Sequence, residues 1–333
     1  MLDPEERLIE EIRSGKDVSL ERSLLLISGI TTESALEAYS EKLDKIRDRF
    51  LEKLASRYPT GPPPAREYTV VARARLLFEH LWNEKPRRCD GNVLLTDVID
   101  AHLSADPGQS VGSCVGLTSL YTVLGVQEGL SLAILTNGSH ILNRLNAGEG
   151  VYNIENTDPL GFDCSLVDES FMEYPAIMIV AHVLNGRGRE RERTNDLAGA
   201  EKDYTKAICL NPAYATGYNN RGAIRLLRQD YAAALADYDR AIEINPRLVE
   251  AHFNHGLARI HSGSYIEAAA DFERVLAMAP EWNEAHICLA FARGRGEGRA
   301  RVTAEEWRPV RPEHEDGARL DGRGLPQINK DLR

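Results

Sequence analysis

The segments LNPAYA (210–215), INPRLV (244–249) and MAPEWN (278–283) decide the fold of the C-terminal half. Their prolines follow one another at intervals of 34 residues. Small and aromatic residues recur with the same period, at Gly188, Gly222, Gly256, Ala200, Ala234, Ala268, Tyr204, Tyr238 and Phe272. This period indicates stacked helix-turn-helix units, in which small residues allow close helix contact and proline ends the second helix.

The pattern resembles the tetratricopeptide repeat. We expect a repeat domain at 181–294, with units at 181–214, 215–248 and 249–282 and a closing helix at 281–293. The resemblance implies that a protein or peptide partner binds in a concave groove, which the first helix of each unit lines. The partner-binding candidates by position are Asn219, Asn220, Phe253, Asn254 and Leu257. We expect residues 295–333, which are rich in Gly and Arg, to form a disordered tail.

The N-terminal half has a different pattern of apolar and polar residues. Residues 1–57 and 70–84 place apolar residues at every third or fourth position, which predicts helices. Short alternating segments at 131–136, 140–145 and 151–157 predict strands, with a hairpin between the second and third. The expected fold class is therefore an α+β domain, of helices and a small antiparallel sheet, followed by an all-α repeat solenoid. Residues 1–85 are expected to pack as a helical region on a core at 86–175.

The stretch GSCVGLTSLY (112–121) places Cys114 at the start of a predicted helix. At that position the helix dipole and the unpaired backbone N–H groups favour a thiolate, and the same N–H groups can stabilise an oxyanion. His140 begins the second predicted strand, from which an imidazole can act as a general base.

The third member of such a site depends on strand register. If the hairpin loop is 146–149, His140 lies directly opposite Glu155, and a shift of one residue places Asn156 there instead. A longer loop brings Asp158 into range. An acid or amide beside the imidazole would fix its tautomer and orientation.

The order of helix cysteine, strand histidine and strand acid resembles the transglutaminase-like superfamily, a circularly rearranged relative of the papain cysteine proteases. In particular it looks like the bacterial transglutaminase-like proteins that carry C-terminal tetratricopeptide repeats. The segments that carry the likeness are GSCVGLTSLY (112–121), LGVQEGL (124–130), SHILNRL (139–145), YNIENTDPLG (152–161) and NVLLTDVIDAHL (92–103).

The resemblance implies a nucleophile at Cys114, a base at His140 and an orienting acid at Glu155 or Asp158, with Gln109 as a candidate oxyanion donor. The predicted function is a cysteine hydrolase or acyl transferase that acts on amide bonds and recruits a protein through its repeats. The alternative is a non-catalytic interaction scaffold whose papain-like domain is degenerate.

The composition of the chain excludes several other classes of function. A net charge of −11 argues against general nucleic-acid binding, because such proteins present a basic face to phosphates. The five cysteines contain no CxxC pair, which argues against a zinc site or a disulfide framework and favours a cytoplasmic location. No apolar stretch approaches the roughly 20 residues of a membrane span. We expect no metal, no other cofactor and no membrane partner.

Overall fold

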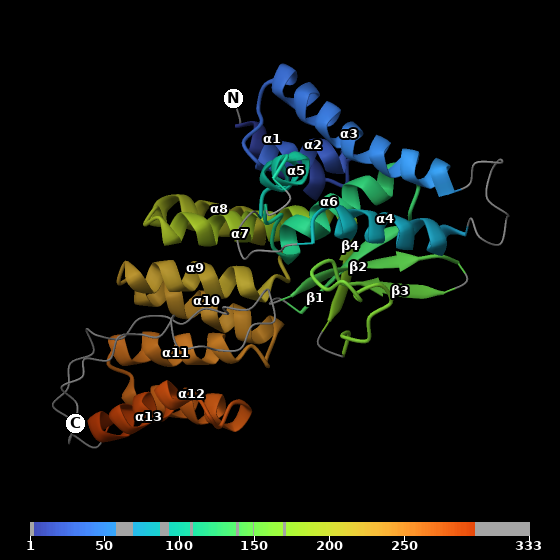
Figure 1. Cartoon of the computed structure of the whole chain (residues 1–333). Coiled ribbons are helices and arrows are strands. Elements are labelled where there is room, and N and C mark those ends of the chain that lie inside the picture. The colour runs from blue at the N-terminus through green and yellow to red at the C-terminus, as the bar shows by residue number, and fades with distance from the viewer. Residues whose placement is uncertain are drawn as a thin grey trace. The chain divides into compact units, whose positions relative to one another are not determined.

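The computed structural model describes residues 3–57, 69–86, 93–106, 109–137, 140–148, 150–168 and 171–296. The chain forms two compact units, of which unit 1 reaches Arg187 and unit 2 begins at Gly188. The boundary falls within one helix, α7 (Ile179–Arg193) (Figure 1). Of the expected disordered tail, Arg295 and Gly296 belong to the last helix and the rest lies outside the described residues. No helix within the described residues is long and apolar enough to cross a membrane.

Unit 1 consists of helices followed by a sheet, as its sequence pattern predicts. Its helices before the sheet are α1 (Pro4–Arg13), α2 (Leu20–Ile27), α3 (Glu33–Arg57), α4 (Val70–Glu84), α5 (Leu95–Leu103) and α6 (Cys114–Gln127). The limits of α4 coincide with the predicted helix, because the Thr69 side chain accepts a hydrogen bond from the Ala72 backbone N–H and caps its first turn.

The sheet has four antiparallel strands in the order β3-β2-β1-β4. The strands are β1 (Leu132–Thr136), β2 (Ile141–Asn146), β3 (Val151–Ile154) and β4 (Met172–Pro175). The first three correspond to the predicted strands. The fourth was not predicted, since its four residues include Glu173 and Pro175 and show no clear alternation of apolar and polar side chains.

The register of the β2–β3 hairpin differs from the expected one. Leu145 lies opposite Tyr152 instead of Gly150, and the last pair before the loop is Asn146 with Val151. In the loop the backbone N–H of Ala147 donates to the carbonyl of Gly150 at 3.0 Å, and Gly148 has a φ of 71°. Glycine adopts this left-handed conformation most readily, and Gly148 lies two residues after Asn146, the last residue of β2.

Helix α6 is the central element of unit 1, and its residues from Cys114 to Gly125 are all buried. It packs against α4 and α5 and against strands β1 and β2. Its polar side chains are satisfied across the interface: the Asn143 amide donates to the Thr122 hydroxyl at 2.7 Å, and the Asn156 amide donates to Thr118 at 3.2 Å and to the Asn143 side-chain oxygen at 2.8 Å. This buried network fixes α6 in one position over the β2–β3 hairpin.

A short 3-10 helix, η1 (Ala176–Met178), leads from β4 into α7. Unit 2 is a stack of helix pairs with the predicted period, and Figure 1 shows the later helices in successive layers. After α7 the helices are α8 (Leu197–Leu210), α9 (Ala215–Leu227), α10 (Tyr231–Ile244), α11 (Val249–His261), α12 (Tyr265–Met278) and α13 (Asn283–Gly296). The pairs α7/α8, α9/α10 and α11/α12 begin at Ile179, Ala215 and Val249, close to the expected unit starts at 181, 215 and 249, and α13 follows them.

The repeating glycines have the packing role that the sequence predicted. A Cβ atom at Gly222 would lie 2.8 Å from the ring of Tyr238, and one at Gly188 would lie 2.6 Å from the ring of Tyr204. The third pair, Gly256 and Phe272, is equally close at 2.8 Å. An aromatic ring on the second helix of each pair therefore rests directly on the glycine of the first.

A second 34-residue ladder consists of buried ion pairs. Aspartates on α8, α10 and α12 are nearly inaccessible to solvent, and each pairs with an arginine twelve residues earlier. The pairs are Arg191–Asp203 at 3.0 Å, Arg225–Asp237 at 2.9 Å and Arg259–Asp271 at 2.7 Å. Each pair joins the two helices of one unit.

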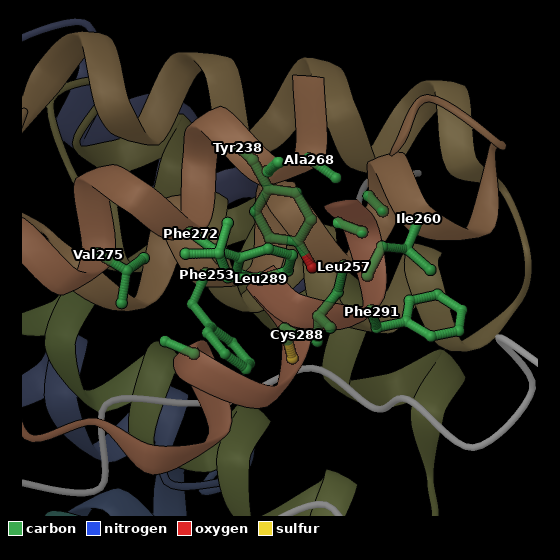
Figure 2. Close-up of a cluster of buried hydrophobic side chains, with 14 of the residues drawn as sticks. Tyr238, Phe253, Leu257, Ile260, Ala268, Phe272, Val275, Cys288, Leu289 and Phe291 are labelled. Atoms are coloured by element: carbon green, nitrogen blue, oxygen red, sulfur yellow. The ribbon is translucent and has the colours of Figure 1, made fainter. Parts of the chain in front are cut away.

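Apolar contacts continue between units. Figure 2 shows side chains of α10 to α13 gathered in one cluster, including Tyr238, Phe253, Leu257, Phe272 and Cys288. The Phe253 ring stacks on that of Trp282 with centroids 4.8 Å apart and meets Phe272 edge to face at 5.5 Å. The core of unit 2 is thus continuous from α10 to the closing helix.

Candidate functional site

Cys114 is the first residue of α6 and is fully buried. Its neighbour Ser113 is the N-cap, but the Ser113 side chain does not cap the helix. The Ser113 hydroxyl is buried and has no hydrogen-bond partner among the described residues. The start of α6 therefore combines a thiol, a hydroxyl and the positive end of a helix dipole.

His140 and Glu155 are in direct contact. His140 immediately precedes β2, Glu155 immediately follows β3, and the imidazole Nε2 lies against the carboxylate Oε2. The contact forms although the register would place Thr157 opposite His140 if both strands were extended. It is a diagonal contact beyond the ends of the strands, because the carboxylate reaches back along the hairpin.

Thr157 holds the other carboxylate oxygen. Its backbone N–H and its hydroxyl donate to Oε1 of Glu155 at 2.8 and 2.6 Å. Burial raises the pKa of Glu155, but the hydrogen bond and charge of His140, together with the bonds from Thr157, outweigh burial and lower the pKa below its usual value. Glu155 is thus a buried carboxylate that stays ionised at neutral pH.

The other two candidates for the third position lie elsewhere. Asn156 turns toward α6 and belongs to the buried amide network with Thr118 and Asn143. Asp158 accepts a hydrogen bond from the backbone of Leu160 at 2.8 Å within its own turn. Of the three residues that sequence reasoning left open, Glu155 is therefore the one placed against His140.

The start of α6 and the His140 region belong to one packed assembly. The Thr118 hydroxyl, one turn after Cys114, donates to the carbonyl of Ile141 at 3.5 Å, and Ile141 follows His140 directly. Gln109, the oxyanion candidate, is half-buried, and its amide donates to the carbonyl of the next residue, Ser110, at 3.4 Å.

This arrangement defines what the pair can do chemically. A carboxylate bonded to Nε2 orients the imidazole and stabilises its protonated form. A thiol at a helix start has the electrostatics of a nucleophile. Among the residues that the structure describes, no group of three or more His, Cys, Asp or Glu side chains is arranged to hold a metal ion.

The candidates in the repeats are all buried. Asn219 on α9 and Asn254 on α11 form an amide pair, in which Asn254 Nδ2 donates to Asn219 Oδ1 at 3.0 Å. The Asn219 Nδ2 group has no acceptor among the described residues. Asn220 is buried beside Asn219, whereas Phe253 and Leu257 belong to the apolar cluster of Figure 2.

The geometry of unit 2 can be compared with known families. Residues 215–248 match the tetratricopeptide repeat. These residues are the pair α9/α10, which contains the Gly222–Tyr238 contact and the Arg225–Asp237 ion pair. The same spacing of glycine, aromatic residue and aspartate in the adjoining pairs extends the tetratricopeptide pattern to α7/α8 and α11/α12. No curated protein matches the chain in sequence.

Several solved tetratricopeptide domains are similar to about a third of this chain. The first repeat domain of Spaghetti (RPAP3), bound to the HSP90 peptide SRMEEVD, is 26% identical over 35% of this chain and 93% of its own, with a TM-score of 0.35. The domain of Arabidopsis OM64 is 32% identical over 35% and 98%, with a TM-score of 0.35. The TPR2B domain of yeast Sti1, in complex with pHsp70, is 27% identical over 34% and 97%, with a TM-score of 0.33.

Two functional features escaped sequence reasoning. The arginines and aspartates of the ion-pair ladder recur with the same 34-residue period as the glycines, and this recurrence is visible in the sequence. Thr157 gave no such signal, because its role depends on how the Glu155 carboxylate turns after β3.

Proposed function

We propose that unit 2 binds an extended segment of a partner protein along the first helices of its repeats. The observation that carries this proposal is the Asn219–Asn254 pair, whose Asn219 Nδ2 group is buried without an acceptor. A buried unpaired amide is costly, and a backbone carbonyl of a bound segment would satisfy it. Because Asn219 is fully buried, binding requires a rearrangement of the side chains that cover it.

The charges on these helices favour recognition of a backbone over recognition of a chain terminus. Arg221 and Arg225 of α9 both pair with Asp237, and Arg259 of α11 pairs with Asp271. These cations are neutralised within the repeats and do not offer a charge to a terminal carboxylate. The partner segment is therefore expected to bind through its internal peptide groups.

Quantitative cross-linking with the intact chain as bait tests this function. Asn219→Ala with Asn254→Ala should remove a specific partner, whereas Cys114→Ala should retain it. As a defined probe, the peptide SRMEEVD and its C-terminally amidated form should show the same affinity. Retention of every partner by the asparagine variant, or a strong preference for the free carboxylate, would contradict the proposed mode.

A second candidate function is catalysis by Cys114, His140 and Glu155, as in a transglutaminase-like cysteine hydrolase or acyl transferase. The His140–Glu155 contact supports it, together with the position of Cys114 at the start of α6. In this proposal the thiolate attacks an amide carbonyl, His140 carries the proton to the leaving amine, and water releases the acyl group. The unit 2 repeats would recruit the substrate in the cytoplasm.

The burial of Cys114 makes access the deciding question for catalysis. The test is the pH dependence of alkylation by iodoacetamide, read by mass spectrometry in the wild type and in His140→Ala. A reactive thiol with a pKa well below about 8.5, which rises when His140 is removed, would establish a thiolate–imidazole pair. A thiol that does not react, or that reacts identically in both proteins, would leave unit 1 as a non-catalytic part of a scaffold.

A further inference from the structure

A cavity in unit 1 lies between α3 and α4, apart from the residues discussed above. Its lining residues are Phe50, Lys53, Leu54, Arg57, Leu76, Glu79, His80 and Asn83. They form one stripe on each helix, at spacings of three and four residues, so the cavity lies between two facing helix surfaces. We propose that this cavity binds a small organic monoanion, namely a carboxylate attached to a short apolar body.

The two cations of the cavity are on the same helix. Lys53 and Arg57 are one turn apart on α3, so their side chains project to the same side. Within the described part of the chain, neither side chain makes an ion pair. Arg49, one turn before Lys53 on α3, lies 3.7 Å from the carboxylate of Glu84. Lys53 and Arg57 are both exposed and thus contribute two positive charges at the open side of the cavity.

His80 adds a buried polar group to the wall. Its side chain is 2% exposed, and its Nε2 lies 3.9 Å from Oε1 of Glu84. Burial, which is the main cause, and the charge of Lys53 lower the pKa of His80 to about 4 despite the nearby Glu84 carboxylate. At neutral pH the ring is uncharged, so His80 adds polar surface but no charge to the cavity wall.

The rest of the lining selects the size and charge of the ligand. Phe50, Leu54 and Leu76 supply apolar surface, and the Phe50 ring lies 5.7 Å from that of His80. Glu79 contributes one negative charge on the α4 side, which opposes the two cations of α3. The net charge of +1 matches a monoanion and disfavours a phosphate dianion, and the apolar surface disfavours an inorganic ion.

Isothermal titration of the full chain with sodium phenylacetate tests the proposal. Acetate lacks the apolar body and phenylacetamide lacks the charge, so each should bind at least about tenfold more weakly than phenylacetate. Methyl resonances of Leu54 and Leu76 should shift as phenylacetate saturates the cavity. The double variant Lys53→Gln with Arg57→Gln should weaken binding about tenfold, because it removes two charge-assisted bonds.

A matched control separates the cavity from general charge effects. Lys45 is exposed on the same helix but does not line the cavity, and Lys45→Gln should leave the affinity unchanged. The proposal is overturned if phenylacetate produces no heat and no methyl shift. It is equally overturned if phenylacetamide binds as tightly, or if the double variant retains full affinity.

Discussion

The two units of this chain are stabilised by contacts of different range. In unit 2, the buried ion pair Arg225–Asp237 joins residues twelve positions apart, and its counterparts repeat every 34 residues. In unit 1, the Asn143–Thr122 hydrogen bond spans 21 residues, and Arg187 reaches Glu5 across 182 residues at 2.8 Å. Local contacts that repeat can be recognised as a period in the sequence, whereas single contacts between distant segments cannot.

The difference also concerns function. In unit 2 the repeated residues build a framework, and the amide pair of Asn219 and Asn254 on neighbouring first helices carries the proposed binding site. Asn254 repeats Asn220 after 34 residues, whereas the counterpart of Asn219 is Phe253. In unit 1 the candidate site consists of residues at the ends of elements, where Cys114 begins α6 and His140 precedes β2. Variants that disturb one unit and leave the other intact therefore test whether the two kinds of stabilisation are separate.

The largest effect is expected from the buried ion pairs of unit 2. Asp237→Ala leaves Arg221 and Arg225 without their common partner, and we expect it to lower the free energy of unfolding by about 3 kcal/mol. The matched control is Glu243→Ala on the same helix, since the Glu243 side chain is 68% exposed and pairs with Arg240 three residues earlier. Its loss should stay within about 0.5 kcal/mol.

Urea unfolding measures the change in the free energy of unfolding, and hydrogen-exchange mass spectrometry shows in which unit the change occurs. Asp237→Ala should increase exchange in α9 and α10 and leave α6 unchanged. A comparable increase in α6 would mean that the two units unfold together, and equal losses for Asp237→Ala and Glu243→Ala would show that the buried pair contributes little.

The glycine–aromatic contacts should give the next largest effect. A Cβ at Gly222 would lie 2.8 Å from the Tyr238 ring, so Gly222→Val should overpack the helix pair and destabilise it by about 2 kcal/mol. At Gly296, the nearest atom to an added Cβ is Cγ1 of Ile266 at 3.5 Å, an ordinary van der Waals contact, so Gly296→Val should have little effect. Thermal unfolding of both variants measures the difference, and equal losses would refute the packing role of Gly222.

Acid should weaken unit 1 through its buried histidines. Burial lowers the pKa of both His80 and His182 to about 4, from a usual value of 6.5. Below pH 6.5 these histidines therefore take up protons in the unfolded chain but stay neutral in the folded chain. Their contribution to the free energy of unfolding is fully present above pH 6.5 and is lost as the pH falls toward 4. At pH 5.5 the loss from His80 alone should be about 1.4 kcal/mol.

The His80→Phe variant isolates this effect. A phenyl ring beside Phe50 keeps the packing but cannot take up a proton, so the variant should lose less stability than the wild type between pH 7 and pH 5.5. Exchange of the α4 amides at both pH values is the measurement. The same acid sensitivity in the variant and in the wild type would exclude His80 as a source.

The sequence allowed the repeats to be placed almost residue by residue, because each repeated position has one packing role. In unit 1 the sequence pattern predicted the helices and three of the four strands. The predicted register of the hairpin was wrong by two residues: the loop contains two glycines, and the one with positive φ is Gly148. Strand β4 was missed, since it joins the sheet by pairing with β1 far earlier in the chain.

The candidate site shows the same limit. That His140 would face an acid or amide was expected from the hairpin, but the choice between Glu155, Asn156 and Asp158 depended on side-chain partners. Asn156 is held by the buried network on α6, and Asp158 by its own turn. Neither constraint is visible as a pattern, because each involves a single contact.

The smallest expected effect concerns Thr157, which holds Glu155 against His140. Thr157→Val removes a hydroxyl that donates to Glu155 at 2.6 Å, and we expect a loss of about 1 kcal/mol, whereas Thr157→Ser retains the donor and most of the stability. Without that donor the pKa of Glu155 should rise toward its usual value. If Thr157 only stabilises the loop, the rate of Cys114 alkylation will not change; if Thr157 positions Glu155 for His140, that rate will fall in Thr157→Val and recover in Thr157→Ser. An unchanged alkylation rate in both variants would mean that the His140–Glu155 contact does not act on Cys114. The contact would then serve only to stabilise the fold of unit 1.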